Sequence, residues 1–512
     1  MNFAANIHLL VKNQYLRNLQ KKQHVSLMNI FLSILYVLLI AGILLTIIFD
    51  NGDSGKKIAW ILVVSVLPVV GIVLYLMFGI SYRQHWLFRR RHKVALETFD
   101  REKDAKLERL LRLKPDYGLI DERFRPLPRL FTDGMDSFPF SKGNSFEIIT
   151  DGKRKLSLLL NDMENARESI HVEYFHFGAD EGSNAIRDMM TKKAKEGVEV
   201  RFINENIANL PIPAVYYDRM KRSGVEVRRF TNPTIGLVNF ATKLNYRDHR
   251  KIVVIDGRIA YTGGMNINNH YFFQWRDTHL RIEGNAAASL QASFLSSWLT
   301  SGGKLKRPLP DYFHEFTEGE TIIGGPNTFT DKMMQVVADT PDAPWPMIQM
   351  GYELVLQNVR DYIFIQSPYF VPPTSFLNAL KAAALRGVDV RLMLPQKVDT
   401  PLLGYANRSF YRECLEAGIR IYERGGEFIH SKTFVCDDYL SQIGTANIDI
   451  RSFDIDYEIN TYIYDRETAL RMKEIFEKDL DISKEITLDE WRQRKWYQTV
   501  FPRIVRLFSG LL

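Results

Sequence analysis

Five residue types recur at the same spacing in two distant segments of the sequence. Counted from a histidine, a lysine follows at position +2, an aspartate at +7, an asparagine at +17 and a carboxylate at +28. The two sets are His249, Lys251, Asp256, Asn266 and Asp277, and His430, Lys432, Asp437, Asn447 and Glu458. One His-x-Lys triplet alone favours a core histidine beside a surface lysine, whereas five shared offsets indicate a duplicated catalytic site.

These residue types suit phosphodiester chemistry. A lysine supplies a point charge for phosphate, and an asparagine adds a neutral hydrogen-bond donor. Histidine acts as a nucleophile or as a general acid and base near neutral pH. The carboxylate at +28 can accept a hydrogen bond from the imidazole nitrogen that faces away from the substrate, which fixes the tautomer of the ring.

Short apolar runs at residues 251–255 and 432–436 predict that each motif lies on a buried strand. Side chains two positions apart on a strand point to the same face. We therefore expect the imidazole and the ammonium of each copy to project into one cavity, which both copies share.

Turn residues follow each motif strand, and the two motif aspartates should secure these turns rather than perform chemistry. Glycines occur shortly afterwards and are expected to let the backbone approach a ligand closely. The turn residues are Asp256, Gly257, Asp437 and Asp438, and the glycines are Gly263, Gly264 and Gly444.

The two motifs resemble those of the phospholipase D superfamily, in which His-x-Lys-x4-Asp occurs twice and builds one shared active site. Their flanks at residues 244–257, 275–283 and 444–453 resemble bacterial cardiolipin synthases. The sequence departs from that family at Asn268-Asn269-His270, where Gly-Asp-Glu is usual.

The resemblance implies a covalent phosphohistidine, with His249 as the nucleophile and His430 as the general acid and base. Pseudo-symmetry leaves the reverse assignment open, and Asp277 and Glu458 should orient the two rings. The implied catalytic set is His249, Lys251, Asp256, His430, Lys432 and Asp437, supported by Asn266, Asp277, Asn447 and Glu458. We expect His171, His176 and His279 to be structural.

The internal repeat is wider than the motifs. Strand-like runs after glycines recur in both copies, for example at residues 197–201 and 387–391, each preceded by a helical pattern. This order predicts an α/β fold with a largely parallel sheet. We expect two phospholipase D-like halves, residues 135–305 and 325–486, related by a pseudo-twofold axis and joined by a connector at 306–324.

Two uncharged runs of 25 residues each, 25–49 and 58–82, predict a transmembrane hairpin. Basic residues without acids flank both ends, at 1–24 and 83–93, so the ends should lie in the cytoplasm. We therefore predict a multi-pass protein of the bacterial cell membrane with a cytoplasmic catalytic body.

Residues 83–134 predict a charged linker, either solvated or acting as a basic collar that holds anionic lipid. The tail at 487–512 predicts an amphipathic helix, either at a bilayer interface or packed on the body. The net charge of +7 suggests an acidic partner. The only cysteines, Cys414 and Cys436, fit no metal or redox spacing and are expected to be reduced core residues.

The resemblance implies a membrane-bound cardiolipin synthase that moves a phosphatidyl group between two phosphatidylglycerol molecules, and the residue types of the site suit this chemistry without a cofactor or a metal. Its partners would be phosphatidylglycerol, other anionic lipids and the membrane, and not nucleic acid. The alternatives are a phospholipase D-type hydrolase or related phosphatidyltransferase, a membrane-bound nuclease, and a non-catalytic scaffold that binds anionic lipid.

Overall fold

The computed structural model divides the chain into two compact units. The first unit comprises Met1–Ser81 with Ile235–Asn245, and the second comprises Tyr82–Thr234 with Tyr246–Leu512. The structure describes residues 28–49, 54–75, 97–113, 116–133, 138–230, 246–316, 320, 327–341 and 343–507.

In the first unit the 22-residue helix Met28–Phe49 is long and apolar enough, by length and composition, to cross a membrane. The second apolar run is not one continuous helix. It divides at Leu67 (φ −127°, ψ 68°) into α2 (Ser54–Val66) and α3 (Pro68–Leu74). Proline disfavours helical geometry in the residue before it, which explains the break. Residues 76–82 of the predicted span lie outside the described residues.

Fifteen strands of the described residues of the second unit form one sheet, in the order β17-β12-β11-β9-β13-β14-β16-β8-β1-β7-β6-β5-β2-β3-β4. Apart from β17, this order is palindromic about the central β8–β1 pair. The strands of the first half are β1 (Phe140–Ile149), β2 (Ser169–Tyr174), β3 (Glu199–Asn204), β4 (Glu226–Arg229), β5 (Lys251–Ile255), β6 (Ile259–Gly263) and β7 (His279–Glu283). Those of the second half are β8 (Thr328–Asp339), β9 (Tyr362–Gln366), β11 (Asp389–Pro395), β12 (Arg420–Arg424), β13 (Thr433–Cys436), β14 (Leu440–Gly444), β16 (Glu458–Tyr464) and β17 (Ser483–Ile486).

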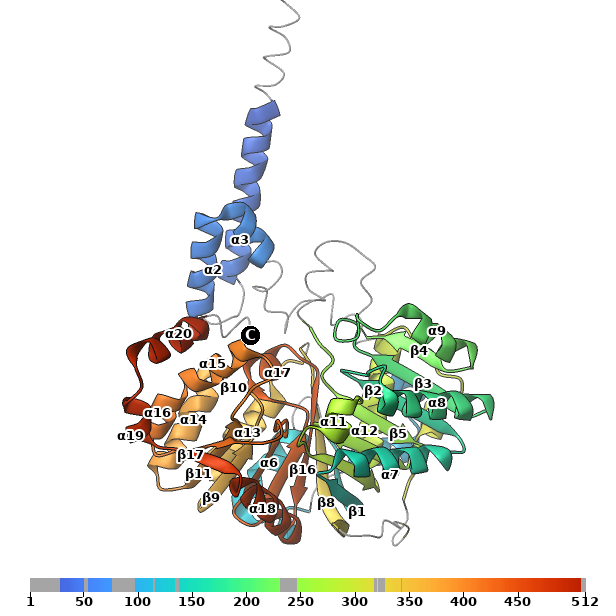
Figure 1. The fold of residues 1–512 in the computed structure, drawn as a ribbon. Helices are drawn as coiled ribbons and strands as arrows, with labels where there is room; N and C mark the ends of the chain where they lie inside the picture. The colour runs from blue at the N-terminus through green and yellow to red at the C-terminus, as the bar shows by residue number, and fades with distance from the viewer. Residues whose placement is uncertain are drawn as a thin grey trace, which may run out of the picture. The chain divides into compact units, whose positions relative to one another are not determined.

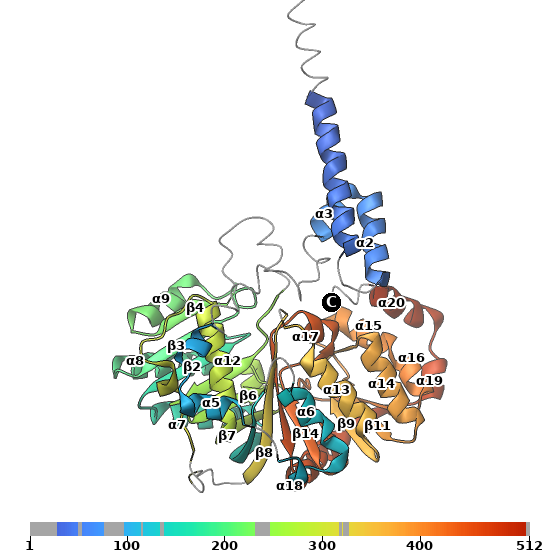
Figure 2. The same ribbon diagram turned by 180° about the vertical axis from the view of Figure 1, so that it is seen from behind.

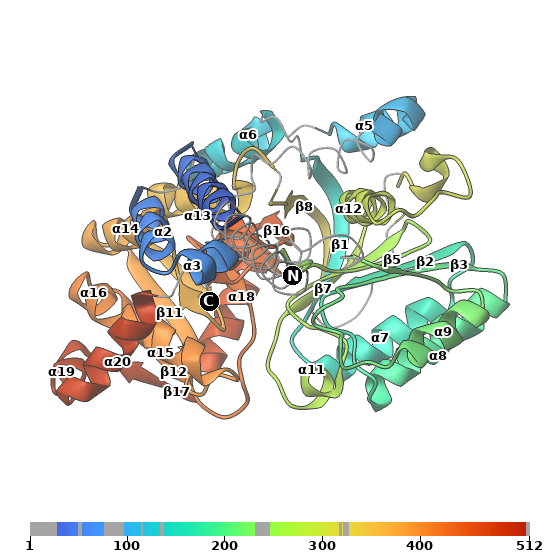
Figure 3. The same cartoon turned by 90° about the horizontal axis from the view of Figure 1, so that it is seen from above.

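Helices cover both faces of each half. The first half carries α7 (Gly152–Glu164), α8 (Glu181–Lys195), α9 (Ala214–Arg222), α11 (Asn269–Phe273) and α12 (Ala286–Thr300). The second carries α13 (Met347–Asn358), α14 (Thr374–Leu385), α15 (Pro401–Ser409), α16 (Tyr411–Glu416), α17 (Ile450–Asp454), α18 (Arg466–Leu480), α19 (Leu488–Arg492) and α20 (Trp496–Leu507), with the short pair β10 (Phe370–Val371) and β15 (Ile448–Asp449). Seen from above, α7, α8 and α9 lie on one face of the first half and α12 on the other (Figure 3).

The two halves lie side by side, the first in green and the second in orange and red (Figure 1). The view from behind shows β8 running between them (Figure 2). The predicted α/β class with two halves is confirmed. The expected largely parallel sheet is wrong, because only β2-β3-β4 and β9-β11-β12 are parallel. The motif strands and those that follow are joined by tight hairpins, which makes them antiparallel.

One hydrophobic cluster is shared by the two halves. Ile252 and Val254 of β5 and Val435 of β13 belong to it, together with Phe294 of α12 and Phe476 of α18. Because both motif strands pack into the same core, the geometry of one motif depends on the placement of the other.

The segment expected as a charged linker also contributes to the body. Its elements α5 (Ala105–Leu111), a 3-10 turn at Glu122–Phe124 and α6 (Pro126–Asp133) carry buried apolar side chains into the cores of the second unit. Pro126 starts α6 rather than ending a helix, since the first helical turn tolerates a residue without an N–H. The buried residues are Leu107, Leu110, Phe124, Leu127 and Phe131. The part of the segment at 83–96 lies outside the described residues.

Candidate active site

Each motif strand ends in the predicted tight turn. The backbone is left-handed at Asp256 (φ 53°) and Gly257 (φ 65°), and at Asp437 (φ 48°) and Asp438 (φ 49°). Two consecutive residues of this kind form the turn that suits the twist of a two-residue hairpin. The turns join β5 to β6 and β13 to β14.

The motif aspartates lie at the turns and not beside the histidines. The Asp256 carboxylate accepts hydrogen bonds from the backbone N–H groups of Arg167, Glu168 and Ser169, at 2.8–2.9 Å. Seven residues of extended chain separate Asp256 from His249, about 20 Å. The Asp256 carboxylate thus fastens the start of β2 to the end of β5, at the turn that it was expected to secure.

Asp437 occupies the equivalent place in the second half. Its carboxylate accepts from the backbone N–H groups of Arg360, Asp361 and Tyr362, at 2.8–3.0 Å, and also from Arg123 at 2.9 Å. Asp437 thus fastens the start of β9 to the end of β13.

Replacing Asp256 with alanine is expected to lower the free energy of unfolding by about 2–4 kcal/mol, because three N–H groups lose a charged acceptor. The folded fraction should retain its turnover number. Chemical denaturation with activity measured below the transition checks both statements, and Asp218→Ala on the exposed side of α9 serves as the control. A loss of turnover in fully folded protein would instead assign Asp256 to the chemistry.

The two motif histidines are held by carboxylates of the opposite half. Nδ1 of His249 lies 2.8 Å from Oε1 of Glu458, and Nδ1 of His430 lies 2.7 Å from Oδ2 of Asp277. The backbone also connects the two halves here, since the N–H of His249 in the first half donates to the carbonyl of Tyr457 in the second half, at 2.9 Å. The predicted orienting residues are thus in contact with the rings, but the pairing crosses the pseudo-twofold axis.

Both motif lysines are buried beside their histidines. Nζ of Lys251 donates to the carbonyl oxygen of His249 and Nζ of Lys432 to that of His430, each at 2.6 Å. Nζ of Lys432 also lies 3.0 Å from Nε2 of His430. The expected projection of imidazole and ammonium into one region is therefore present in each half.

Burial shifts every ionisable group of the site toward its neutral form. It lowers the pKa of Lys251 to about 8 and that of Lys432 to about 7. It raises the pKa of Asp277 to about 6 and that of Glu458 to about 7. For both histidines, burial and then the nearby lysine charges lower the pKa well below its ordinary value.

The electrostatic partners of these groups cross between the halves. The pKa of His430 is lowered further by the charge of Lys251 and by His249. That of His249 is lowered by Lys432. The two sets therefore form one site, with two cations concentrated around two neutral rings, which suits the binding of an anion such as a phosphodiester.

The motif asparagines occupy different environments. Nδ2 of Asn266 donates to the hydroxyl of Tyr271 at 2.8 Å, and its Oδ1 accepts from the N–H of His176 at 3.2 Å. Oδ1 of Asn447 is buried and has no hydrogen-bond partner among the described residues. Both asparagines are almost fully buried, and Asn447 retains an unused polar atom.

The glycines that follow the motifs make room for the protein's own side chains. A Cβ on Gly264 would lie 2.1 Å from Oδ1 of Asp277, and one on Gly444 would lie 1.9 Å from Oδ1 of Asn460. A Cβ on Gly263 would lie 2.7 Å from the backbone of His279. The close approach at these glycines is to Asp277, to the backbone of His279 and to the side chain of Asn460.

An aromatic wall around His430 was not predicted from the sequence. The Tyr271 hydroxyl lies 3.4 Å from Nε2 of His430, and the rings of Trp275 and Phe428 lie 5.6 and 6.0 Å from the imidazole. His249 contacts Phe175 edge-on at 4.8 Å. The available signal is alternation, because Phe428 and His430 flank Ile429, which forms an isolated β-bridge with Arg276, and residues two apart in an extended chain point to the same side.

The three histidines expected to be structural have different surroundings. His171 stacks on Phe294 at 4.6 Å inside the core, and His279 is fully buried. Nδ1 of His176 accepts from Nδ2 of Asn268 at 2.6 Å. Asn268 also caps α11, so the departure at this position builds a contact that a glycine could not make.

No group of three or more His, Cys, Asp or Glu side chains is placed to hold a metal ion within the described part of the chain. Cys414 and Cys436 are both buried and unpaired with one another, in agreement with the expected core positions.

The comparisons with family models and with curated proteins agree with one another. A family model described as "Cardiolipin synthase, PLD-like domain" matches residues 159–298 and 354–480, and one described as "Phospholipase_D-nuclease N-terminal" matches residues 34–79. The major cardiolipin synthase of Bacillus subtilis is 33% identical over 508 residues, which covers 95% of this chain and 100% of the relative. A cardiolipin synthase of Oceanobacillus iheyensis is 34% identical over 94% of this chain and 99% of its own.

Among solved structures, a phosphatidylserine synthase from Haemophilus influenzae has the same fold. It aligns with a TM-score of 0.57 and 15% identity, over 77% of this chain and 100% of the other. At that identity the likeness is one of fold alone.

Proposed function

Because the chain belongs to the cardiolipin synthase family of phospholipase D-like proteins, we propose that it makes cardiolipin from two molecules of phosphatidylglycerol. The observation that carries the proposal is the convergence of His249 and His430, each held by the carboxylate of the other half. Beside each histidine lies a buried lysine, and the two lysines are able to neutralise a phosphodiester.

The first step forms a covalent phosphatidyl-enzyme. Nε2 of His249 attacks the phosphorus of phosphatidylglycerol in line with the bond to its glycerol headgroup. An N–P bond forms, the P–O bond breaks, and the electron pair leaves on the glycerol oxygen. The bound phosphodiester anion raises the pKa of His430, and the protonated ring gives its proton to that oxygen, so free glycerol departs.

The second step transfers the phosphatidyl group to lipid. The terminal hydroxyl of another phosphatidylglycerol gives its proton to His430, and its oxygen attacks the same phosphorus. The N–P bond breaks, and its electron pair returns to His249. One phosphodiester replaces another, so the reaction requires no nucleotide.

The hydrogen bonds of the two rings support this division of roles. The carboxylate of Glu458 is hydrogen-bonded to Nδ1 of His249. Nε2 of His249 has no hydrogen-bond partner among the described residues, so its lone pair is available for attack. Nε2 of His430 instead lies 3.4 Å from the hydroxyl of Tyr271, and the ammonium of Lys432 lies 2.7 Å from Nδ1 and 3.0 Å from Nε2 of the same ring. A ring whose Nε2 is already an acceptor suits a proton carrier better than a nucleophile.

We also propose that the enzyme is anchored in the bacterial cell membrane, with the catalytic unit on the cytoplasmic side. The apolar helix Met28–Phe49 supports an anchor, and the basic residues at 1–24 and 83–93 support the orientation. The two α/β halves are proposed to extend over residues 135–305 and 325–486. Anchoring holds both lipids near the site in two dimensions, which favours a lipid acceptor over water.

The test is to incubate the purified full-length protein with phosphatidylglycerol labelled in its glycerol headgroup and its acyl chains, without nucleotide. Cardiolipin and free glycerol in equal amounts are expected. Phosphatidic acid with glycerol would show a hydrolase. No turnover in folded protein would leave a lipid-binding scaffold or a nuclease.

The dependence of kcat/KM on pH is expected to be bell-shaped with its maximum near pH 7. The rate should fall on the acid side as Asp277 and Glu458 are protonated, with pKa values of about 6 and 7. It should fall on the alkaline side as Lys432 and Lys251 lose their protons, with pKa values of about 7 and 8. A bound phosphodiester anion raises all four pKa values, so the kcat profile should lie at higher pH. Coincident profiles would contradict this assignment.

A further inference from the structure

The C-terminal helices α19 and α20 are fastened to the outside of the second half. Pro502 and Val505 are buried, and Phe501 contacts Tyr405 edge-on, at 4.7 Å between ring centroids. The guanidinium of Arg506 donates to Glu413 of α16 at 2.5 Å. These contacts fix the position of α20 against α15 and α16, and the expected alternative of a tail packed on the body is the one that the structure contains.

A pocket of about 410 Å³ lies between these four helices, a volume typical of sites for small ligands. Its lining contains six arginines and two glutamates, Glu413 and Glu416. The arginines are Arg408, Arg412, Arg492, Arg494, Arg503 and Arg506. None of the residues that line it belongs to the catalytic site.

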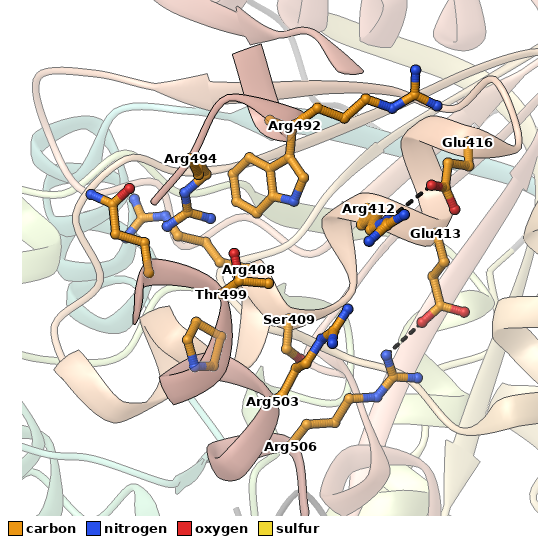
Figure 4. Close-up of a pocket in the computed structure, with 13 residues that line it drawn as sticks. Arg408, Ser409, Arg412, Glu413, Glu416, Arg492, Arg494, Thr499, Arg503 and Arg506 are labelled. Carbon is orange, nitrogen blue, oxygen red and sulfur yellow. Dashed lines mark hydrogen bonds and ion pairs between the residues drawn. The ribbon is translucent and has the colours of Figure 1, made fainter. Parts of the chain in front are cut away.

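The positive charge of the pocket exceeds the carboxylates that could balance it. Arg412 pairs with Glu416 at 2.9 Å, and Arg506 pairs with Glu413, as the dashed lines in Figure 4 show. Arg408 pairs with Glu423, also at 2.9 Å.

The remaining three arginines, Arg492, Arg494 and Arg503, make no ion pair within the described part of the chain. The guanidinium of Arg494 lies 3.9 Å from the centre of the Trp491 ring. Burial, and then the charge of the adjacent Arg408, lower the pKa of Arg494, and the carboxylate of Glu423, which already pairs with Arg408, opposes this shift. Planar guanidinium groups in such an arrangement recognise phosphate.

The outer face of α20 exposes large apolar side chains next to this pocket. Trp496, Val500, Ile504 and Leu507 are 76%, 43%, 47% and 81% exposed. Their spacing of three or four residues places them along one stripe of the helix. A helix with an exposed apolar stripe, a tryptophan at its end and arginines beside it has the composition of a helix that lies at a bilayer surface.

We propose that this pocket binds the phosphate of an anionic diacyl phospholipid, while the apolar stripe of α20 contacts its acyl chains. Charge complementarity identifies the headgroup, and the adjoining stripe identifies a lipid rather than a soluble phosphate. The site is separate from the catalytic histidines and does not depend on the reaction proposed above.

The test uses the full-length protein in nanodiscs and follows hydrogen–deuterium exchange of peptides from 401–416 and 488–507. Discs of phosphatidylcholine are compared with discs that contain increasing phosphatidylglycerol, and a third sample adds inorganic phosphate to neutral discs. Exchange in these peptides is expected to slow only as phosphatidylglycerol is added.

Arg503→Glu is expected to raise the phosphatidylglycerol fraction required for half-maximal protection by about fivefold or more, the factor attached to one basic side chain at an anionic surface. Arg219→Glu, an exposed helical arginine of α9, is the matched control and should behave as the unaltered protein. Arg503→Gln should give an intermediate shift, which keeps the test informative should the charge reversal prevent folding.

Each other outcome overturns the assignment. Full protection in phosphatidylcholine alone would mean that neutral lipid or another part of the chain covers the face. Protection by inorganic phosphate would mean a soluble anion. No protection, or equal behaviour of the Arg503 and Arg219 variants, would mean that the pocket binds no anionic lipid.

Discussion

In a His249→Ala variant the covalent phosphatidyl adduct and the release of glycerol are both expected to disappear, with transfer falling by about 10⁴-fold or more. The reason is that no other ring in the described site offers a free Nε2 toward the phosphorus. His430→Ala should also lose transfer with phosphatidylglycerol, because the glycerol oxygen would then have to leave as an unprotonated alkoxide, which is a poor leaving group.

A substrate with a good leaving group separates the two roles. Phosphatidyl-p-nitrophenol needs no general acid, so His430→Ala should still release one equivalent of nitrophenol and accumulate the adduct, while His249→Ala should release none. His314→Ala, a partly exposed histidine outside the site, is the control. A burst in His249→Ala and none in His430→Ala would reverse the assignment.

The second large effect is expected from a carboxylate that belongs to the opposite motif. Glu458→Gln keeps the shape of the side chain but removes the charged acceptor 2.8 Å from Nδ1 of His249. Loss of the correct tautomer typically costs a factor of about 10²–10⁴. The slowed step should be formation of the adduct on His249, although Glu458 lies in the same half as His430.

Single-turnover measurements with phosphatidyl-p-nitrophenol test whether each carboxylate serves the histidine of the opposite half. Adduct formation should be slowed in Glu458→Gln and nearly unchanged in Asp277→Asn, whose defect should fall on transfer to the acceptor lipid. Glu485→Gln, on the exposed strand β17, provides the control. If Asp277→Asn slowed adduct formation and Glu458→Gln did not, each carboxylate would serve the histidine of its own half.

The sequence is informative where spacing along one strand determines geometry. His249 and Lys251 share a strand face because they are two residues apart, and the turn at Asp256-Gly257 follows from residues that tolerate a left-handed backbone. The paired helices and strands of the two halves follow from repeated patterns of the same kind. These features are local, so the residues of one segment are enough to determine each of them.

Features that depend on contacts between distant segments could not be predicted in this way. The offset of +28 is the same whether Asp277 serves His249 or His430, so spacing cannot show that the carboxylates are exchanged. Gly264 is required by the carboxylate of Asp277, which packs against it from the segment just before β7. The direction of the motif strands depends on hairpin connections, which an alternation of strand-like and helix-like patterns does not specify.

The palindromic order of the sheet about the β8–β1 pair, together with the crossed carboxylates, has a consequence for the tolerance of the protein to mutation. Duplicated parts often protect a system, because one copy substitutes for a damaged one. In the proposed mechanism each copy supplies either the nucleophile or the proton carrier, and also the carboxylate that orients the histidine of the other copy. A lesion in the carboxylate of one repeat is therefore expected to impair the histidine of the other repeat, so neither repeat can drift in sequence while the other preserves the function.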